Sequence, residues 1–118
     1  MAITNALASL AVKDLGASSK WYERLLERGA DSMPMPEVAE WRFDNGGWLQ
    51  VYQSADRVGR GSVTLAVDDL DEQIAKLGRL GIDVGKRMAT VKVEVVMIKD
   101  PDGNSIAFAQ AKDPTMAQ

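Results

Sequence analysis

The stretch LAVKDL, residues 10–15, returns 55 residues later as LAVDDL, residues 65–70, and only the fourth position differs. Each copy closes an apolar run with partial alternation, a pattern that predicts strands over about 3–13 and 60–68. Each copy also has an aspartate, Asp14 or Asp69, directly before its last residue, and aspartate is typical of the start of a helix. The chain therefore contains the same strand–helix unit twice.

A helix is expected after each strand. Asp14 is placed to cap the first helix, which should run to about Glu27 and end near Gly29. Asp69, followed three residues later by Glu72, resembles a capping box at the start of the second helix. Leucine and isoleucine then recur at helical spacing, which gives the second helix one apolar stripe.

Two hairpins follow the helices. AEWRF and WLQVYQ flank the turn sequence DNGG, and VKVEVVMIK and SIAFAQA flank DPDGN. Short strands near 30–33 and 84–88 would complete each half. The stretch MPMPE, residues 33–37, is expected to be a loop because its two prolines cannot donate to a strand ladder. Each half then reads strand–helix–strand–strand–strand, over 3–56 and 60–112.

Three motifs together cover nearly the whole chain: LAVKDLGASSKWYERLL, LAVDDLDEQIAKLGRLGIDV and, the most specific, KDPDGNSIAFAQ. They resemble the vicinal oxygen chelate superfamily, which includes glyoxalase I, extradiol dioxygenases, methylmalonyl-CoA epimerase, and the fosfomycin- and bleomycin-resistance proteins. The resemblance implies a single α+β domain over 1–118. In it, two βαβββ modules would form the cup-shaped mixed sheet of the glyoxalase/bleomycin-resistance/dioxygenase fold.

The resemblance also implies where a metal would bind, and this sequence departs from the family there. The family's ligands are a His near the start of each half's first strand and a Glu late in each half's last strand. The His positions fall at Leu7 and Ser62, and the Glu positions at Gln50 and Ala107. The whole chain has no His and no Cys, so no such ligand set exists for a transition metal. We therefore expect no metal and no cofactor, and no metal-dependent glyoxalase or dioxygenase activity.

Strand alternation suggests which side chains line the concave face. We predict that a small organic ligand is bound there by Trp48, Gln50, Tyr52, Trp41, Ser62, Thr64, Leu7, Ala107, Met35 and Met88. Trp48 and Tyr52 could equally fill the cup as ordinary core residues. Trp41 could line a groove or pack under the first helix, and Trp21 is expected in helix packing or a subunit contact.

Composition excludes several other classes of protein. The 118 residues are 46% hydrophobic and 26% charged, which suits one globular domain. A net charge of −3 with scattered Lys and Arg argues against a nucleic-acid partner. No apolar run approaches the ~20 residues of a membrane span, and no signal peptide is recognised, so the cytoplasm is the expected location.

Three functions remain open. The first is a metal-free, homodimeric binding protein of the bleomycin-resistance type that sequesters an aromatic or cationic compound, as in drug or toxin resistance. The second is a metal-free enzyme, of lyase or isomerase type, with Tyr52 as acid and Glu40 or Glu94 as base. The third is a non-catalytic association module that uses the Trp21 helix as partner surface.

Overall fold

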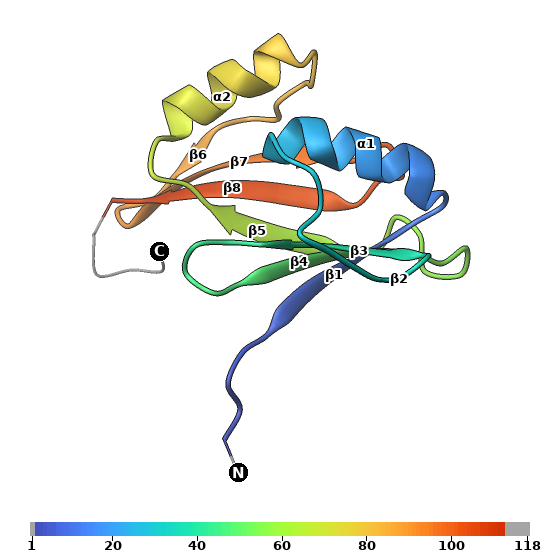
Figure 1. The fold of residues 1–118 in the computed structure, drawn as a ribbon. Helices are drawn as coiled ribbons and strands as arrows, with labels where there is room; N and C mark the ends of the chain where they lie inside the picture. Colours follow the sequence, from blue (N-terminus) through green and yellow to red (C-terminus); the bar gives the residue numbers. More distant parts are fainter. Residues whose placement is uncertain (1, 113–118) are drawn as a thin grey trace. The chain divides into compact units, whose positions relative to one another are not determined.

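A computed structural model describes residues 2–112, and their elements follow the order βαβββ twice (Figure 1). This order confirms the predicted α+β class with two βαβββ modules. The elements are β1 (Leu7–Val12), α1 (Leu15–Leu26), β2 (Ser32–Met35), β3 (Val38–Arg42), β4 (Trp48–Gln53), β5 (Ser62–Ala66), α2 (Leu70–Arg79), β6 (Met88–Ala89), β7 (Val93–Lys99) and β8 (Ser105–Ala111). No helix among residues 2–112 is long and apolar enough to cross a membrane.

The described chain forms two compact units, and each is considered by itself. The first contains residues up to 61 together with 101–104, and the second contains 62–100 together with the residues from 105 onward. Each unit has one four-stranded mixed sheet, in the order β1-β4-β3-β2 in the first and β5-β8-β7-β6 in the second. In each sheet the first and last strands of the module run parallel, and the other pairs are antiparallel.

Helix α1 begins where the sequence predicts and ends slightly earlier. The Asp14 side chain accepts a hydrogen bond from the Ala17 N–H at 3.4 Å, which satisfies one of the free donors of the first turn. At the other end, Glu27 adopts the left-handed conformation with φ 63°. Gly29, which was predicted near the C-cap, lies two residues beyond it, because Glu27 already adopts the conformation that a C-terminal glycine usually adopts.

The core of the first unit lies between α1 and its sheet (Figure 1). Tyr22 from α1 and Trp41 from β3 are both fully buried, and their ring centroids are 6.0 Å apart. Leu49 and Val51 of β4 are buried on the same side of the sheet. Burial of each such side chain contributes about 1.5–3 kcal/mol, so this layer holds α1 on the sheet.

Helix α2 begins with part of the predicted capping box. The Glu72 N–H donates to Asp69 Oδ1 at 3.0 Å, while the Glu72 carboxylate lies 3.6 Å from Lys76 Nζ. Leu70 and Leu77 are fully buried, as the apolar stripe predicts. Sequence spacing therefore identified both the start and the packing face of this helix.

The predicted loop over 33–37 is wrong, because most of it belongs to strand β2. This strand lies at the edge of its sheet, so the missing N–H of Pro34 can point away from the ladder at no cost in hydrogen bonds. The pairing slips by one residue along β2: Ser32 pairs with Glu40, whereas Met35 pairs with Val38. Such a bulge bends an edge strand and changes the side to which its residues point.

The strand predicted over 84–88 is also largely wrong. Strand β6 contains only Met88 and Ala89, which pair with β7. Upstream of it, the Gly85 N–H donates to the Met97 carbonyl at 3.0 Å, so the chain follows β7 without forming a regular ladder. The last edge strand of the second sheet is therefore short.

The turn between β7 and β8 belongs to the first unit, and we call its residues 101–104 the clasp. The Asn104 side chain is fully buried. Its Oδ1 accepts the Gly61 N–H at 2.9 Å, and its Nδ2 donates to the Ala11 carbonyl at 2.8 Å. One amide therefore satisfies a backbone donor and a backbone acceptor from two segments that are distant in sequence.

Asp102 adds further contacts within the clasp. Its Oδ2 accepts from the Lys13 N–H at 3.1 Å and lies 3.5 Å from the Ser18 hydroxyl. Gly59 has φ 77°, and a Cβ placed on it would lie 2.4 Å from the Asp102 carbonyl oxygen. Only glycine fits at this position, because a side chain would collide with backbone.

The two hairpin turns repeat a backbone conformation but not the clasp. Gly46 and Gly103 stand 57 residues apart and have φ of 96° and 98°. The residue after each differs, Gly47 in the first turn and Asn104 in the second. The second turn therefore has a buried side-chain amide, Asn104, at the position where the first turn has Gly47.

An ion-paired group supports the strand that carries Trp41. Arg28 donates to the Asp31 carboxylate and to the Arg42 carbonyl, and the Arg42 N–H donates to Asp31 Oδ2 at 2.6 Å. The Arg28 guanidinium, followed by the Arg42 amide, holds the pKa of Asp31 below its ordinary value. The Arg28 carbonyl accepts from Trp41 Nε1 at 3.0 Å, so this group connects the end of α1 to β3.

Replacing Asn104 with Ala should lower the free energy of unfolding by about 1–3 kcal/mol, because it removes two hydrogen bonds, one from the part-buried Gly61 N–H and one to the buried Ala11 carbonyl. Urea unfolding followed by circular dichroism measures this change. Asn45→Ala, in the exposed turn of the first hairpin, is the control and should stay within about 0.5 kcal/mol of the parent. Equal effects of the two substitutions would contradict the role given to the clasp.

Replacing Asp31 with Asn should destabilise the protein at pH 7, and the deficit should shrink as the pH falls below about 4. A carboxyl with a lowered pKa contributes stability above its unfolded-state pKa, and that contribution is lost as the pH falls through the folded-state pKa. Urea unfolding at pH 7, 5 and 3 measures the difference between parent and variant. Asp44→Asn, at an exposed turn position, should show no such convergence.

Candidate functional site

Strand register arranges nine side chains on the face of the first sheet opposite α1. We call this surface the helix-free face of the first sheet. Each row takes one residue from β1, one from β4 and one from β3, in that order. The rows are Leu7–Trp48–Arg42, Ser9–Gln50–Glu40 and Ala11–Tyr52–Val38. Four of the predicted ligand-binding residues, Leu7, Trp48, Gln50 and Tyr52, therefore lie on one surface.

The middle row is joined by hydrogen bonds, and we call it the polar row. The Ser9 hydroxyl donates to Gln50 Oε1 at 3.1 Å, and Gln50 Nε2 donates to Glu40 Oε2 at 2.9 Å. Gln50 and Glu40 are half-buried and Ser9 is exposed. The polar row therefore crosses three strands and ends in a carboxylate.

Aromatic side chains stand on both sides of the polar row. Trp48 and Tyr52 lie two residues before and after Gln50 on β4, each roughly 7 Å away along the strand. Both are half-buried, so part of each ring surface is accessible. Sites for small organic molecules typically combine aromatic surfaces with a few polar groups, as this surface does.

Trp41 lies on the opposite side of the sheet. It pairs with Leu49 in the register of β3 and β4, it is fully buried, and its indole N–H is used by the Arg28 carbonyl. Of the two placements that the sequence left open, the structure shows packing under the helix. Trp21, on the same helix as Tyr22, is half-buried and meets the Tyr22 ring edge-on, with centroids 4.9 Å apart.

The second sheet presents a different helix-free face. Ser62 pairs with Ser105, and Thr64 pairs with Ala107. Ser62 and Thr64 are exposed, while Ala107 is buried. Lys99 pairs with Ser105 in the same row and its Nζ donates to the Ser105 hydroxyl at 3.0 Å, so this face carries a cation beside hydroxyls and small side chains. No row among these pairs ends in a carboxylate, as the polar row of the first sheet does.

Glu94, considered as a base from sequence, lies on the α2 side of the second sheet. It pairs with Gln110, whose side-chain oxygen accepts from the first N–H of α2. Arg87 contacts the Glu94 carboxylate at 2.7 Å and the Asp71 carboxylate at 2.6 Å. Hydrogen bonds from Arg87 to Glu94 and then Asp71 raise the pKa of the guanidinium above its usual range, so Glu94 is engaged in an ion pair.

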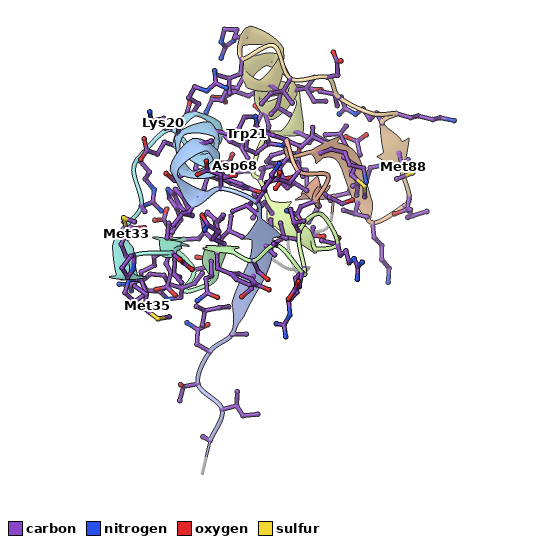
Figure 2. All side chains as sticks on the ribbon, turned by 90° about the vertical axis from the view of Figure 1, so that its right-hand side faces the viewer. Lys20, Trp21, Met33, Met35, Asp68 and Met88 are labelled. Carbon is purple, nitrogen blue, oxygen red and sulfur yellow. The ribbon has the colours of Figure 1, made fainter. Side chains whose placement is uncertain are left out.

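Met35 and Met88 occupy equivalent positions in the two sheets. Met35 pairs with Val38 and Met88 with Val95, and the two valines stand 57 residues apart. The bulge in β2 causes this placement, and Figure 2 shows the Met33 and Met35 sulfurs on opposite sides of the strand. Sequence alternation could not have indicated it, because Met33 and Met35 would share a face in a regular strand.

The residues at the family's metal-ligand positions do not fit a metal. Leu7 lies one row from Gln50, and Ser62 has the same relation to Ala107, so the register supports the equivalence of these positions. Leu7 and Ala107 carry no donor atom, and Gln50 Oε1 already accepts from Ser9. Among residues 2–112, no group of three or more His, Cys, Asp or Glu side chains could hold a metal ion.

Solved structures share the repeated βαβββ order of elements seen in this chain. A glyoxalase/bleomycin resistance protein from Catenulispora acidiphila is 32% identical, with a TM-score of 0.80 over 90% of this chain and 96% of that one. This chain belongs to the glyoxalase/bleomycin resistance protein family.

Two further structures share the fold. TnmS3, an antibiotic-binding protein from Streptomyces sp. CB03234, is 24% identical with a TM-score of 0.79 over 95% of this chain and 99% of that one. A lactoylglutathione lyase from Agrobacterium tumefaciens is 20% identical with a TM-score of 0.75, over 91% and 92%. Neither a protein-family model nor a curated protein sequence matches the chain.

Trp41→Phe should lower the free energy of unfolding by about 2–3 kcal/mol, because it leaves the Arg28 carbonyl unpaired and a gap under α1. Trp48→Phe should change it by less than about 1 kcal/mol, since Trp48 is half-buried on the other face. Urea unfolding measures both. The difference in fluorescence between parent and variant gives the emission of the replaced tryptophan. Acrylamide should quench the emission of Trp48 more readily than that of Trp41. The reverse order would contradict the assignment of the two faces.

Proposed function

We propose that this protein binds a small organic molecule on the helix-free face of the first sheet, without a metal. The observation that carries the proposal is the polar row with Trp48 and Tyr52 beside it. Gln50 stands where the family pattern has a metal-binding Glu, and its side chain is instead hydrogen-bonded to Ser9 and Glu40. These groups can hold a ligand through hydrogen bonds and aromatic contact.

Sequestration of an aromatic or cationic compound, as in resistance to a drug or toxin, is the form of binding we favour. Two of the similar structures are described as a glyoxalase/bleomycin resistance protein and an antibiotic-binding protein, which supports this direction. We further propose that the protein acts as a homodimer in the cytoplasm. The absence of Cys from the sequence fits a reducing compartment.

A metal-free enzyme is the second candidate, and one observation favours it. Glu40 and Tyr52 lie in adjacent rows of the helix-free face of the first sheet, so a carboxylate and a phenol are both presented to the same surface. Such a pair can act as base and acid. Conversion of a bound compound to product, followed by mass spectrometry, would favour this candidate over simple sequestration.

The binding function can be tested with EDTA-treated protein and a panel of aromatic and cationic compounds, screened by thermal shift and titrated by calorimetry. Trp48→Ala should weaken the Kd of a hit by about tenfold or more, as expected for loss of an aromatic contact at a binding centre. Added Zn²⁺ or Ni²⁺ should leave the affinity unchanged.

Trp21→Ala is the matched control, since Trp21 lies on α1 and not on the proposed binding face. It should leave the Kd within twofold of the parent. A hit that binds only with a divalent ion, or that both substitutions weaken equally, would refute metal-independent binding at this face.

A further inference from the structure

We infer that the ligand is an N–H cation, such as a protonated amine or a guanidinium carried on an aromatic body, and that Glu40 is its counter-ion. This inference rests on the proposed function and specifies the chemistry of the same site. It starts from the state of the Glu40 carboxylate at the end of the polar row.

The Glu40 carboxylate is half-buried and is held by one side-chain donor. Gln50 Nε2 donates to its Oε2 at 2.9 Å. Among residues 2–112, no Lys, Arg or His forms an ion pair with it. An ionised carboxylate can accept about four hydrogen bonds, so most of its capacity remains for a ligand.

The direction of the hydrogen bonds in the polar row also favours a ligand that donates hydrogen bonds. Ser9 uses its hydroxyl proton on Gln50 Oε1, and Gln50 uses an amide proton on Glu40, so both bonds point toward the carboxylate. An anion placed at the end of this row would meet a negative charge. A cation with N–H groups would meet the free lone pairs of Glu40, with hydrogen bonds strengthened by charge.

Arg42 is the other charged side chain of these three rows, and it does not reverse this preference. It pairs with Trp48 in the neighbouring row and is exposed, whereas Glu40 is half-buried. Charges with less solvent around them are screened less, so Glu40 dominates the field felt by a ligand lying on the sheet. The Trp48 ring next to the polar row offers a surface for the ligand's aromatic body and a further attraction for a cation.

Three probes of similar shape separate the contributions: 1-naphthylmethylamine, its N,N,N-trimethylammonium derivative and 1-naphthylmethanol. The probes are dissolved at pH 7, where the primary amine is protonated. Their binding to the full chain is measured by saturation-transfer NMR and calorimetry. The parent should bind the primary ammonium at least tenfold more tightly than the alcohol. The trimethylammonium probe, which keeps the charge but lacks N–H, should lie between them.

Glu40→Gln removes the charge and keeps an oxygen that can accept from Gln50. This substitution should lower the affinity for the ammonium probe at least tenfold and change the affinity for the alcohol by less than twofold. Glu37→Gln, the same change at an exposed glutamate nearby, should leave both affinities within twofold. Circular dichroism of each variant should show unchanged secondary structure and a thermal midpoint within a few degrees.

The outcomes also separate this inference from the proposed function. Suppose that Trp48→Ala lowers the affinities for the alcohol and the ammonium probe equally while Glu40→Gln changes neither. The proposed binding face is then supported, and the inference of a cationic ligand is refuted. If Glu37→Gln weakens the ammonium as much as Glu40→Gln, the effect is one of net charge and Glu40 is not the counter-ion. If none of the probes or screened compounds binds in a way that depends on Trp48, both proposals fail.

Discussion

The first unit depends on one buried amide. The Asn104 side chain joins the Ala11 carbonyl at the end of β1 to the Gly61 N–H just before β5. Loss of this side chain would remove the partner of the part-buried Gly61 N–H and leave the Ala11 carbonyl with the longer bond from the Gly59 N–H at 3.5 Å. Asp102 extends the same contact toward the start of α1, and the close approach of its carbonyl explains why position 59 is glycine. The end of β1, the start of α1 and the linker are therefore held by four consecutive residues.

The parallel pairing of β1 with β4 assembles the proposed binding surface on this framework. Because side chains alternate along a strand, the register that buries Trp41 under α1 also places Trp48, Gln50 and Glu40 together on the other face. A slip of one residue would move the polar row into the apolar layer beneath the helix. The core residues on one face therefore fix the register that brings together the side chains of the proposed site on the other face.

The sequence predicted the repeated order of elements, the N-caps of both helices and the fold class, because those features depend on local spacing. The β2 strand was missed at 33–37, since proline excludes only a donor and not an edge position. The side to which Trp41 points depends on pairing with β4, which alternation within one short strand does not determine. The bonds of Gln50 to Ser9 and to Glu40 join residues 41 and 10 positions apart, respectively, so no local sequence pattern indicates them. The role of Asn104 was hidden in the same way, within a motif that also reads as an ordinary turn.

The clasp has a consequence for the order in which the chain is made. Asn104 is 43 residues downstream of Gly61, so the first unit lacks its closing contact when its own strands and helix have already left the ribosome. At about 5–20 residues per second, synthesis of that interval takes several seconds. During this time the Ala11 carbonyl and the Gly61 N–H do not yet have the Asn104 side chain as a partner. The last hairpin of the newly made chain thus completes the unit that was made first.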